Sequence, residues 1–438
     1  MPSTFDRLQQ RIRRRELRVA ILGLGYVGLP LAVAFAEAGF SVLGLDRDLG
    51  RVRALRAGRS YVPDISADTL RTLMARRRLQ VTSQLDRLRQ ADAILVCVPT
   101  PLLKSREPDL SHLLEATRTV ARHLTPPALM ILESTTYPGT TDGVVRMELE
   151  AAGHRLDRDL FLAFSPERID PSNARFSIKN IPKLVGGVTP RATRLAAQLY
   201  GQVLDRVVPL SSSRVAETAK LLENTFRIIN IGLANEFALL CHAMKIDVWE
   251  VIEAASTKPF GFMPFYPGPG IGGHCIPSDP IYLSWRARRD GVEARLINLA
   301  AQINTQMPHH VVDRVGQLLN RQGAAMKGSH LLVLGVSYKR NVNDTRDSPA
   351  FEILQALVQR GAHVEYHDPW VPGIELQGRP YRSRPLTPAR LRAADCVLIT
   401  TDHSNVNYQL VGRYAKAVFD ARNVMRGVRP RPAVLEAL

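Results

Sequence analysis

A single cysteine, Cys275, lies in the segment PFYPGPGIGGHCIPSDP, which runs from 264 to 280. The segment is so rich in glycine and proline that we expect it to form neither helix nor strand. A thiol in a loop has an access that a core cysteine lacks, and an accessible thiolate is a nucleophile. Cys275 is therefore the first candidate for chemistry, with a purely structural loop as the alternative.

The other cysteines suggest no second reactive site. Cys97, Cys241 and Cys396 lie far apart, and no two cysteines form a C-x-x-C pair. This spacing favours neither a disulfide framework nor a zinc site, and we predict no metal. Cys97 lies within an apolar run and is expected to be a small core residue.

A lysine and an asparagine, Lys220 and Asn224, are four residues apart in a stretch with helical periodicity from 211 to 256. The stretch predicts one or two long helices, so both side chains project from one helical face. Asparagine is a poor mid-helix residue unless its amide has a task. A surface lysine and a capping-type asparagine are the alternative. Such helices commonly build a dimer, although a monomeric core helix also fits.

The elements that must position these residues begin with a glycine turn. RVAILGLGYVGLPLAVAFAEAGFSVLGLDRD contains an apolar strand, Gly23, Gly25 and Gly28, a helix of small residues, and a strand that ends at Asp46. The first glycine permits a tight turn, the second lets the backbone approach a pyrophosphate, and the third lets helix and strand pack closely. The unit predicts a dinucleotide site, with a turn that serves packing alone as the alternative.

The strand ends indicate which dinucleotide binds. Asp46 is placed to accept hydrogen bonds from the adenosine ribose hydroxyls, which favours NAD over NADP, although Arg47 stands beside it. Strands are also predicted in ADAILVCVPTP and ALMILESTTYPGTT, and each ends in a threonine-containing turn. Ligands bind at the carboxyl edge of a parallel sheet, so Thr100 and Thr135 are candidate cofactor contacts, with plain turn or capping roles as the alternative.

A faint internal repeat indicates a second domain of the same kind. HLLVLGVSYKR, GAHVEYHDPW and ADCVLITTDH follow the order of RVAILGLGYVG, GFSVLGLDRD and ADAILVCVPT. The glycine fingerprint is lost after Gly335, so the second domain is expected to hold something other than a dinucleotide. Lys339, at a strand end, suits a phosphate or sugar oxygen. The predicted fold class is α/β, with two Rossmann-like parallel-sheet domains joined by a long-helix central domain.

Composition limits the classes of function. With 438 residues, 45% of them apolar, the chain is long enough for two or three domains with buried cores. Its apolar runs are shorter than the roughly 18 to 20 residues of a membrane span, and its Arg-rich start lacks the apolar segment of a signal peptide. We therefore expect a cytoplasmic protein that binds no membrane. The net charge of +17 is interpreted as a preference for polyanionic small ligands and not as a nucleic-acid surface, because the arginines are scattered.

Several motifs occur in a characteristic order over nearly the whole chain. They are the G-x-G-x-x-G unit, SPERI (165–169), the K-x-x-x-N pair, PGPGIGGHCIPSDP, GVSYKRNVNDTRDSP and DARN (420–423). Together they resemble the UDP-glucose/GDP-mannose dehydrogenase family of nucleotide-sugar dehydrogenases. The segment KPFGFMPFYPGPGIGGHCIPSDP is most similar to the bacterial UDP-N-acetylglucosamine 6-dehydrogenases, which supply precursors for surface-polysaccharide synthesis.

The resemblance implies a reaction and its catalytic residues. Family members oxidise the C6 alcohol of a nucleotide sugar to a carboxylate in two hydride transfers, use two NAD⁺, and release no aldehyde. Cys275 would hold the intermediate as a thiohemiacetal and then as a thioester. Lys220 and Asn224 would stabilise the oxyanions formed at C6, with Lys220 a candidate acceptor of the alcohol proton. Asp279 would position a water or Lys220, and Glu167 would activate the water that opens the thioester.

The same resemblance implies two groups of binding residues. Those near NAD are Gly23, Gly25, Tyr26, Val27, Gly28, Asp46, Arg51, Thr100, Thr135 and Arg346. Those near the UDP-sugar are Arg168, Ile169, Arg227, Gly272, Tyr338, Lys339 and Arg422. Gly272 and Gly273 would let the loop approach the reacting carbon closely, whereas His274 is interpreted as structural.

Two sites depart from the family pattern. Ala421 stands where a glycine is usual, and Lys258 and Pro259 stand where some relatives have an arginine. The first departure concerns the backbone of the last motif. The second concerns recognition of the sugar hydroxyls.

Alternatives to this function remain open. UDP-N-acetylglucosamine is the expected substrate, and UDP-N-acetylmannosamine and UDP-glucose are alternatives. A single-step β-hydroxyacid dehydrogenase would need neither Cys275 nor a C-terminal domain, and a non-catalytic nucleotide-binding scaffold would need no reactive set. The predicted domains are an NAD-binding domain at 1–205, a central helical domain at 206–315 and a UDP-sugar-binding domain at 316–438. We expect a homodimer or higher homo-oligomer, built through the central domain.

Overall fold

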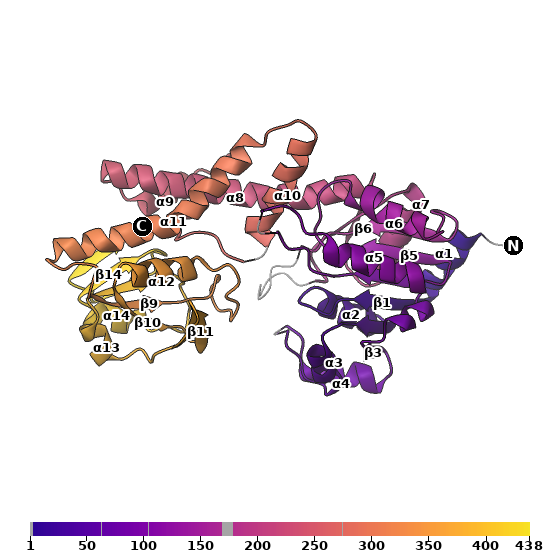
Figure 1. Cartoon of the computed structure of the whole chain (residues 1–438), viewed down its shortest axis with the longest axis horizontal. Coiled ribbons are helices and arrows are strands. Elements are labelled where there is room, and N and C mark those ends of the chain that lie inside the picture. The colour runs from indigo at the N-terminus through magenta and orange to yellow at the C-terminus, as the bar shows by residue number, and fades with distance from the viewer. Residues whose placement is uncertain (1–2, 63, 104, 169–177, 274) are drawn as a thin grey trace. The chain divides into compact units, whose positions relative to one another are not determined.

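The computed structural model describes residues 3–62, 64–103, 105–168, 178–273 and 275–438 (Figure 1). The chain divides into two compact units. The first comprises Met1–Glu223 with Trp285–Val292, and the second comprises Asn224–Ser284 with Glu293–Leu438. Each unit has its own sheet and its own hydrophobic cores.

An eight-stranded sheet forms the centre of the first unit. Its strands are β1 (Arg18–Leu22), β2 (Ser41–Leu45), β3 (Leu79–Thr82), β4 (Ala93–Val96), β5 (Ala128–Leu132), β6 (Leu160–Phe164), β7 (Lys183–Gly187) and β8 (Val207–Leu210). Their order is β3-β2-β1-β4-β5-β6-β7-β8, and only the β6–β7 pair is antiparallel. The order of the first six strands is that of a dinucleotide-binding Rossmann sheet.

Several helices of the first unit begin at a side-chain N-terminal cap. Ser3 and Asp6 form a capping box at the start of the first helix. Thr189 caps a later helix, which has Pro190 as its first residue. The helices are α1 (Thr4–Arg14), α2 (Gly28–Glu37), α3 (Leu49–Arg56), α4 (Ala67–Ala75), α5 (Ser111–His123), α6 (Arg146–Ala151) and α7 (Pro190–Tyr200), with short 3₁₀ and π segments at Leu85–Gln90 and Thr140–Val145.

The central strand β1 serves two cores, one on each face of the sheet. Val19 and Ile21 belong to the core that includes residues of α1, α2 and α7. Ala20 and Leu22 belong to the other core, which includes residues of α5 and α6. Because both faces are covered, the strand reads as a continuous apolar run, as is usual in parallel sheets.

Long helices follow the first sheet. They are α8 (Ser213–Met244), α9 (Val248–Ser256), α10 (Cys275–Arg289) and α11 (Arg295–Arg321). The first two confirm the helical prediction for 211–256. The third corrects the expectation that no helix forms between 264 and 280, because it begins at Cys275. The first N–H groups of a helix have no intrahelical acceptor, so Pro277 fits the first turn, and Pro280 removes one hydrogen bond.

The second unit contains a five-stranded parallel sheet. Its strands are β9 (His330–Leu334), β10 (His363–His367), β13 (Cys396–Ile399), β14 (Ala417–Asp420) and β15 (Val434–Ala437), in the order β10-β9-β13-β14-β15. The remaining elements are α12 (Pro349–Gln359), α13 (Pro388–Ala393), α14 (Tyr408–Tyr414) and the hairpin of β11 (Gly373–Leu376) and β12 (Arg379–Arg382). Alternate residues of β9 again enter two different cores.

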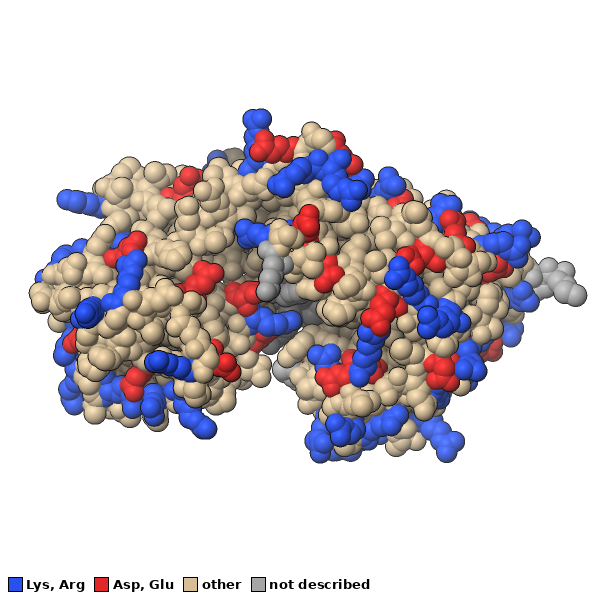
Figure 2. All heavy atoms as spheres, in the orientation of Figure 1, with Lys and Arg blue, Asp and Glu red and all other residues tan. Residues whose placement is uncertain are grey.

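The predicted fold class is confirmed, because two mainly parallel sheets are separated in sequence by long helices. The boundaries predicted for three domains stay a prediction. In the described part of the chain, no helix combines the length and the apolar character that a membrane crossing requires. On the visible face, Lys and Arg side chains are spread over the surface, and Asp and Glu side chains lie among them (Figure 2).

Candidate active site

The glycine turn after β1 is shaped by close backbone packing. Gly23 has φ +97°, and a Cβ atom there would lie 2.5 Å from the carbonyl oxygen of Cys97. A Cβ atom at Gly28 would lie 1.8 Å from the carbonyl oxygen of Gly23. At Gly25 an added Cβ atom would meet nothing within 4 Å. The turn is thus packed at its first and third glycines and open at its second, which fits a pyrophosphate held close to the backbone at the start of α2.

Asp46 is fixed beside this turn at the end of β2. Its carboxylate is buried and accepts hydrogen bonds from the backbone N–H groups of Leu24 and Asp48, both at 2.9 Å. Arg51 Nη1 lies 3.5 Å from the same carboxylate. Arg47 is directed to another element, because its guanidinium donates to Glu115 at 2.6 Å. The geometry fits a ribose acceptor, and Arg47 is engaged away from Asp46.

Two threonines meet at the carboxyl edge of the first sheet. Thr100 Oγ1 donates to the carbonyl oxygen of Thr135 at 2.8 Å, which joins the turns that follow β4 and β5. Tyr26 and Val27, which lie between Gly25 and Gly28, differ in burial. Tyr26 is 44% exposed, whereas Val27, the N-cap residue of α2, is partly buried against the core.

A buried carboxyl group ties α8 to the turn after β5. Glu217 accepts from the N–H groups of Gly139 at 2.7 Å and Thr141 at 2.9 Å, and from the Thr141 hydroxyl at 2.6 Å. Burial, which outweighs these hydrogen bonds, raises the pKa of Glu217 to about 7. Lys220, one turn further along α8, is 8% exposed. Sequence reasoning missed Glu217, which anchors the helix turn that carries the predicted lysine.

The SPERI motif follows β6 and is held by several ion pairs. The Arg168 guanidinium lies 2.7 Å from Glu223 and donates to the carbonyl oxygen of Pro182 at 2.6 Å. Glu167 lies 3.6 Å from the ammonium of Lys183 and is mostly buried. Ile169 lies outside the described residues.

In the second unit, Cys275 and Asp279 occupy consecutive turns of α10. Cys275 is exposed, as its predicted access requires, and Asp279 is 3% exposed. The side-chain amide of Asn224 donates to Asp279 Oδ2 at 2.5 Å. Lys220 and Asn224 are one turn apart on α8, and the Asn224 amide is engaged by Asp279. Its role at an oxyanion stays a prediction. Arg227, further along α8, is exposed.

The two loop glycines pack against another segment of the second unit. A Cβ atom at Gly272 would lie 2.6 Å from Tyr338 Cβ, and one at Gly273 would lie 2.9 Å from the Tyr338 ring. The N–H of Gly273 donates to the carbonyl oxygen of Arg346 at 3.0 Å, and the Arg346 side chain pairs with Asp344. The glycines therefore admit Tyr338. Whether they also approach a reacting carbon stays a prediction, as does the contact of Arg346 with NAD.

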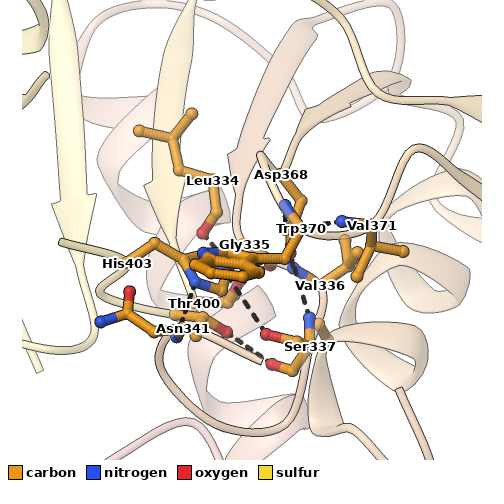
Figure 3. A network of polar contacts seen from close by, with 12 residues as sticks. Leu334, Gly335, Val336, Ser337, Asn341, Asp368, Trp370, Val371, Thr400 and His403 are labelled. Carbon is orange, nitrogen blue, oxygen red and sulfur yellow. Dashed lines mark hydrogen bonds and ion pairs between the residues drawn. The ribbon is translucent and has the colours of Figure 1, made fainter. Parts of the chain in front are cut away.

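A polar network replaces the glycine fingerprint at the edge of the second sheet (Figure 3). Asp368 Oδ2 accepts from the N–H groups of Val336 and Ser337 at 2.7 and 3.2 Å, and from His403 Nε2 at 3.1 Å. Asn341 N–H donates to His403 Nδ1 at 3.0 Å, which leaves the ring hydrogen on Nε2. Burial opposes ionisation of Asp368, but these hydrogen bonds hold its pKa below the usual value.

The network fixes the turn that continues into Tyr338 and Lys339, because the Asp368 carboxylate accepts from the N–H groups of Val336 and Ser337. That this domain holds no second dinucleotide stays a prediction. Arg422 follows β14, and its Nε donates to the carbonyl oxygen of Thr400, which follows β13, at 2.8 Å. Burial lowers the pKa of Arg422.

Several buried polar residues escaped sequence reasoning, namely Glu133, Lys183, Tyr200, Glu217 and His403. The first two carry a detectable signal, because a charged residue at the end of an apolar strand needs a partner when it is buried. Their partners come from distant strands and could not be read from the sequence. Among the described residues, no group of His, Cys, Asp and Glu is arranged to hold a metal ion.

Models of one protein family match three successive parts of the chain. They are described as the NAD binding domain, the central domain and the UDP binding domain of the UDP-glucose/GDP-mannose dehydrogenase family. They match residues 17–204, 214–306 and 332–427. The cofactor is therefore NAD, as predicted.

Similar proteins and structures cover nearly the whole chain. UDP-N-acetyl-D-mannosamine dehydrogenase of Pyrococcus horikoshii is 35% identical over 416 residues, which cover 94% of this chain and 96% of that protein. UDP-N-acetyl-D-glucosamine 6-dehydrogenase of Pseudomonas aeruginosa is 33% identical over 419 residues, which cover 94% and 98%. A solved structure of the Pyrococcus horikoshii UDP-D-ManNAc dehydrogenase matches with a TM-score of 0.87 and 33% identity over 96% of this chain and 99% of that one. A UDP-glucose dehydrogenase structure from Pyrobaculum islandicum matches with a TM-score of 0.84 and 29% identity over 96% and 97%. The chain belongs to the UDP-glucose/GDP-mannose dehydrogenase family.

Proposed function

We propose that this protein oxidises the C6 alcohol of a UDP-N-acetylhexosamine to the carboxylate in two steps, each of which removes one hydride and one proton. The observation that carries the proposal is the arrangement in the second unit. Cys275 is exposed on the first turn of α10, and Asp279 lies buried one turn later in a hydrogen bond with Asn224. An exposed thiol one helical turn from an ordered polar pair supports covalent capture of an aldehyde.

The substrate that we favour is UDP-N-acetylglucosamine, because the sequence of the segment that leads to Cys275 resembles that of UDP-N-acetylglucosamine 6-dehydrogenases. UDP-N-acetylmannosamine is the second candidate, because a dehydrogenase for that sugar is 35% identical to this chain. The product would feed surface-polysaccharide synthesis.

The glycine turn is part of the proposed NAD-binding site. Its open side at Gly25 and the N-terminus of α2 suit a pyrophosphate, and Asp46 suits the ribose hydroxyls. Tyr26, Val27, Arg51, Thr100, Thr135 and Arg346 complete the proposed set. When bound, NAD⁺ supplies the hydride acceptor for each oxidation.

The chain's own residues would carry the proton and acyl chemistry. Lys220 takes the alcohol proton and, with Asn224, stabilises the oxyanion at C6. The thiolate of Cys275 then adds to the aldehyde carbon, which gives a thiohemiacetal whose loss of a second hydride leaves a thioester. Glu167 accepts a proton from the water that attacks this thioester, and the bond between carbon and the Cys275 sulfur breaks to release the acid.

The UDP-sugar is proposed to lie against the edge of the second sheet. Tyr338 and Lys339 stand on the turn fixed by Asp368, and the partly buried guanidinium of Arg422 lies at the end of β14. Arginine is well suited to phosphate oxygens. Arg168, Ile169, Arg227 and Gly272 complete the proposed substrate set, and 1–205, 206–315 and 316–438 stay our proposed domains.

A homodimer through α8 is part of the proposal. Apolar side chains that are 45% to 61% exposed recur along this helix, namely Leu222, Phe226, Leu233, Phe237, Leu240 and Met244. Their spacing of three, four and seven residues forms one stripe, which a second copy of the same helix would cover.

The experiment that tests the function is the NADH yield from purified protein with a limiting amount of each UDP-sugar. Two NADH per sugar supports the proposal and identifies the substrate. One NADH per molecule indicates a single-step dehydrogenase, and no NADH from any UDP-sugar in the presence of NAD⁺ indicates a non-catalytic scaffold.

A further inference from the structure

A buried cation lies directly behind the proposed hydrolytic base. Lys183 begins β7, and its side chain is only 6% exposed. Its ammonium is 2.6 Å from Glu133 Oε2, 3.1 Å from the carbonyl oxygen of Pro166 and 3.6 Å from Glu167 Oε2. The hydroxyl of Tyr200 donates to the other oxygen of Glu133. One ammonium is therefore shared between two carboxyl groups and one backbone carbonyl.

Burial of this cluster is costly and needs a reason. Removing an ion from water costs several kcal/mol, and well-packed apolar residues often serve stability as well as a buried ion pair does. The cluster is closed at one end, where Glu133 and Tyr200 are fully buried, and it reaches the surface at Glu167, which is 14% exposed. Its most accessible member is thus the residue to which we assign a proton transfer.

The titratable groups that face Lys183 come from four elements. They belong to Glu133 after β5, Glu167 after β6, Tyr200 at the end of α7, and Cys97 after β4. Burial alone would lower the pKa of Lys183, but the two carboxyl groups outweigh burial and raise it above its usual value. Burial raises the pKa of Glu133 to about 7 despite the neighbouring ammonium. When Glu133 is protonated, Glu167 is the only charged carboxyl group of the cluster that the Lys183 ammonium neutralises.

We propose that Lys183 is a positioning residue for Glu167. Its ammonium holds the Glu167 carboxylate and the Pro166 carbonyl, while Glu133 and Tyr200 hold the ammonium in place. The inference rests on the proposed role of Glu167 in thioester hydrolysis. It adds the residues that orient this carboxylate, and Lys183 acts only through Glu167.

The test separates hydrolysis from the oxidation steps. Lys183→Met keeps the length of the side chain and removes its charge. We expect a burst of two NADH per active site with UDP-N-acetylglucosamine or UDP-N-acetylmannosamine, followed by steady turnover roughly 10- to 100-fold slower than in the wild type. A sugar acyl adduct should accumulate on Cys275, visible by intact-protein mass spectrometry. Lys179→Met is the matched control, since Lys179 is exposed and pairs with Glu37.

A second variant distinguishes positioning from stability. Lys183→Met alone leaves Glu133 buried without its cation, which can destabilise the fold. The double variant Lys183→Met/Glu133→Gln removes both charges and keeps both shapes, so it should recover thermal stability. We expect it to keep the slow hydrolysis and the adduct. If it instead hydrolyses at the wild-type rate without accumulating the adduct, Lys183 has only a structural role.

Failure of the inference is distinguishable from failure of the function. If Glu167→Gln accumulates the adduct and neither Lys183 variant does, the inference is wrong and the proposed function stands. If Glu167→Gln accumulates no adduct, the role of Glu167 is wrong, and the positioning role of Lys183 is wrong with it.

Discussion

Two of the fingerprint glycines should respond to alanine in opposite ways. An added Cβ atom at Gly28 would lie 1.8 Å from the carbonyl oxygen of Gly23, so the turn and α2 must separate by about 1 Å or more. An added Cβ atom at Gly25 meets nothing within 4 Å, and φ at Gly25 is not positive. Gly28→Ala should therefore damage folding, whereas Gly25→Ala should damage only binding.

The magnitudes follow from these contacts. Overpacking typically costs about 1–3 kcal/mol, so Gly28→Ala should lower the melting temperature by roughly 2–4 °C for each kcal/mol. Gly25→Ala should leave stability unchanged or raise it by up to about 1 kcal/mol, because alanine restricts the unfolded chain. The methyl group would hold a pyrophosphate away from the backbone. Loss of one charge-assisted hydrogen bond, about 1.5–3 kcal/mol, weakens NAD⁺ binding by roughly 10- to 150-fold.

Thermal unfolding with and without NAD⁺ measures the stability of both variants, and calorimetric titration measures their affinity for NAD⁺. In the absence of NAD⁺, Gly25→Ala should have the melting temperature of the wild type. It should lack the increase in melting temperature that NAD⁺ gives the wild type. Wild-type affinity in Gly25→Ala would refute the placement of the pyrophosphate at this glycine. Wild-type stability in Gly28→Ala would refute the packing argument.

Three further variants test other parts of the account. Asp46→Asn should lower the ratio of kcat/KM for NAD⁺ over NADP⁺ by about tenfold or more, since an anionic ribose acceptor is lost, and an unchanged ratio would remove Asp46 from that role. Glu217 has a pKa raised by burial to about 7, so its stabilising contribution is complete below about pH 4.5 and is lost as the pH rises through 7. In urea unfolding, wild-type stability should therefore fall by about 2–3 kcal/mol more between pH 5 and pH 8 than that of Glu217→Gln, and parallel curves would contradict the burial argument. Phe237→Asp should shift the protein toward monomer in sedimentation experiments, whereas Met147→Asp, at an exposed apolar residue of α6, should not; equal behaviour of the two would exclude the α8 stripe as the dimer contact.

The fold class could be predicted from the sequence because the local strand, turn and helix patterns agree with the observed fold. The glycine turn, the apolar strand before it and the acidic strand end after it follow one another within a single βαβ unit, so spacing alone indicates their arrangement. The second sheet could be predicted from the repeat of the same strand pattern. In contrast, the expectation for the loop near Cys275 was wrong, since proline is tolerated in the first turn of a helix.

The polar contacts behind the site could not be predicted in the same way. Glu133 and Lys183 are 50 residues apart and meet because β5 and β7 both flank β6 in the sheet. Asp368 and His403 meet across the edge of the second sheet, 35 residues apart. Such pairs depend on strand order and side-chain burial, which a residue pattern does not encode locally. The family resemblance implied the residues thought to touch ligands but not those that hold them in place.

Covalent, two-step oxidation through Cys275 can be tested by intact-protein mass spectrometry of Glu167→Gln. The variant is mixed with NAD⁺ and UDP-N-acetylglucosamine, or with UDP-N-acetylmannosamine if the wild type oxidises that sugar instead, and is quenched during the stall that follows the burst. We expect two NADH per active site and an added mass equal to the sugar nucleotide acyl group, and we expect no added mass when Cys275→Ser is introduced as well. Continuous turnover without any adduct, or an adduct that persists without Cys275, would contradict covalent oxidation through this residue.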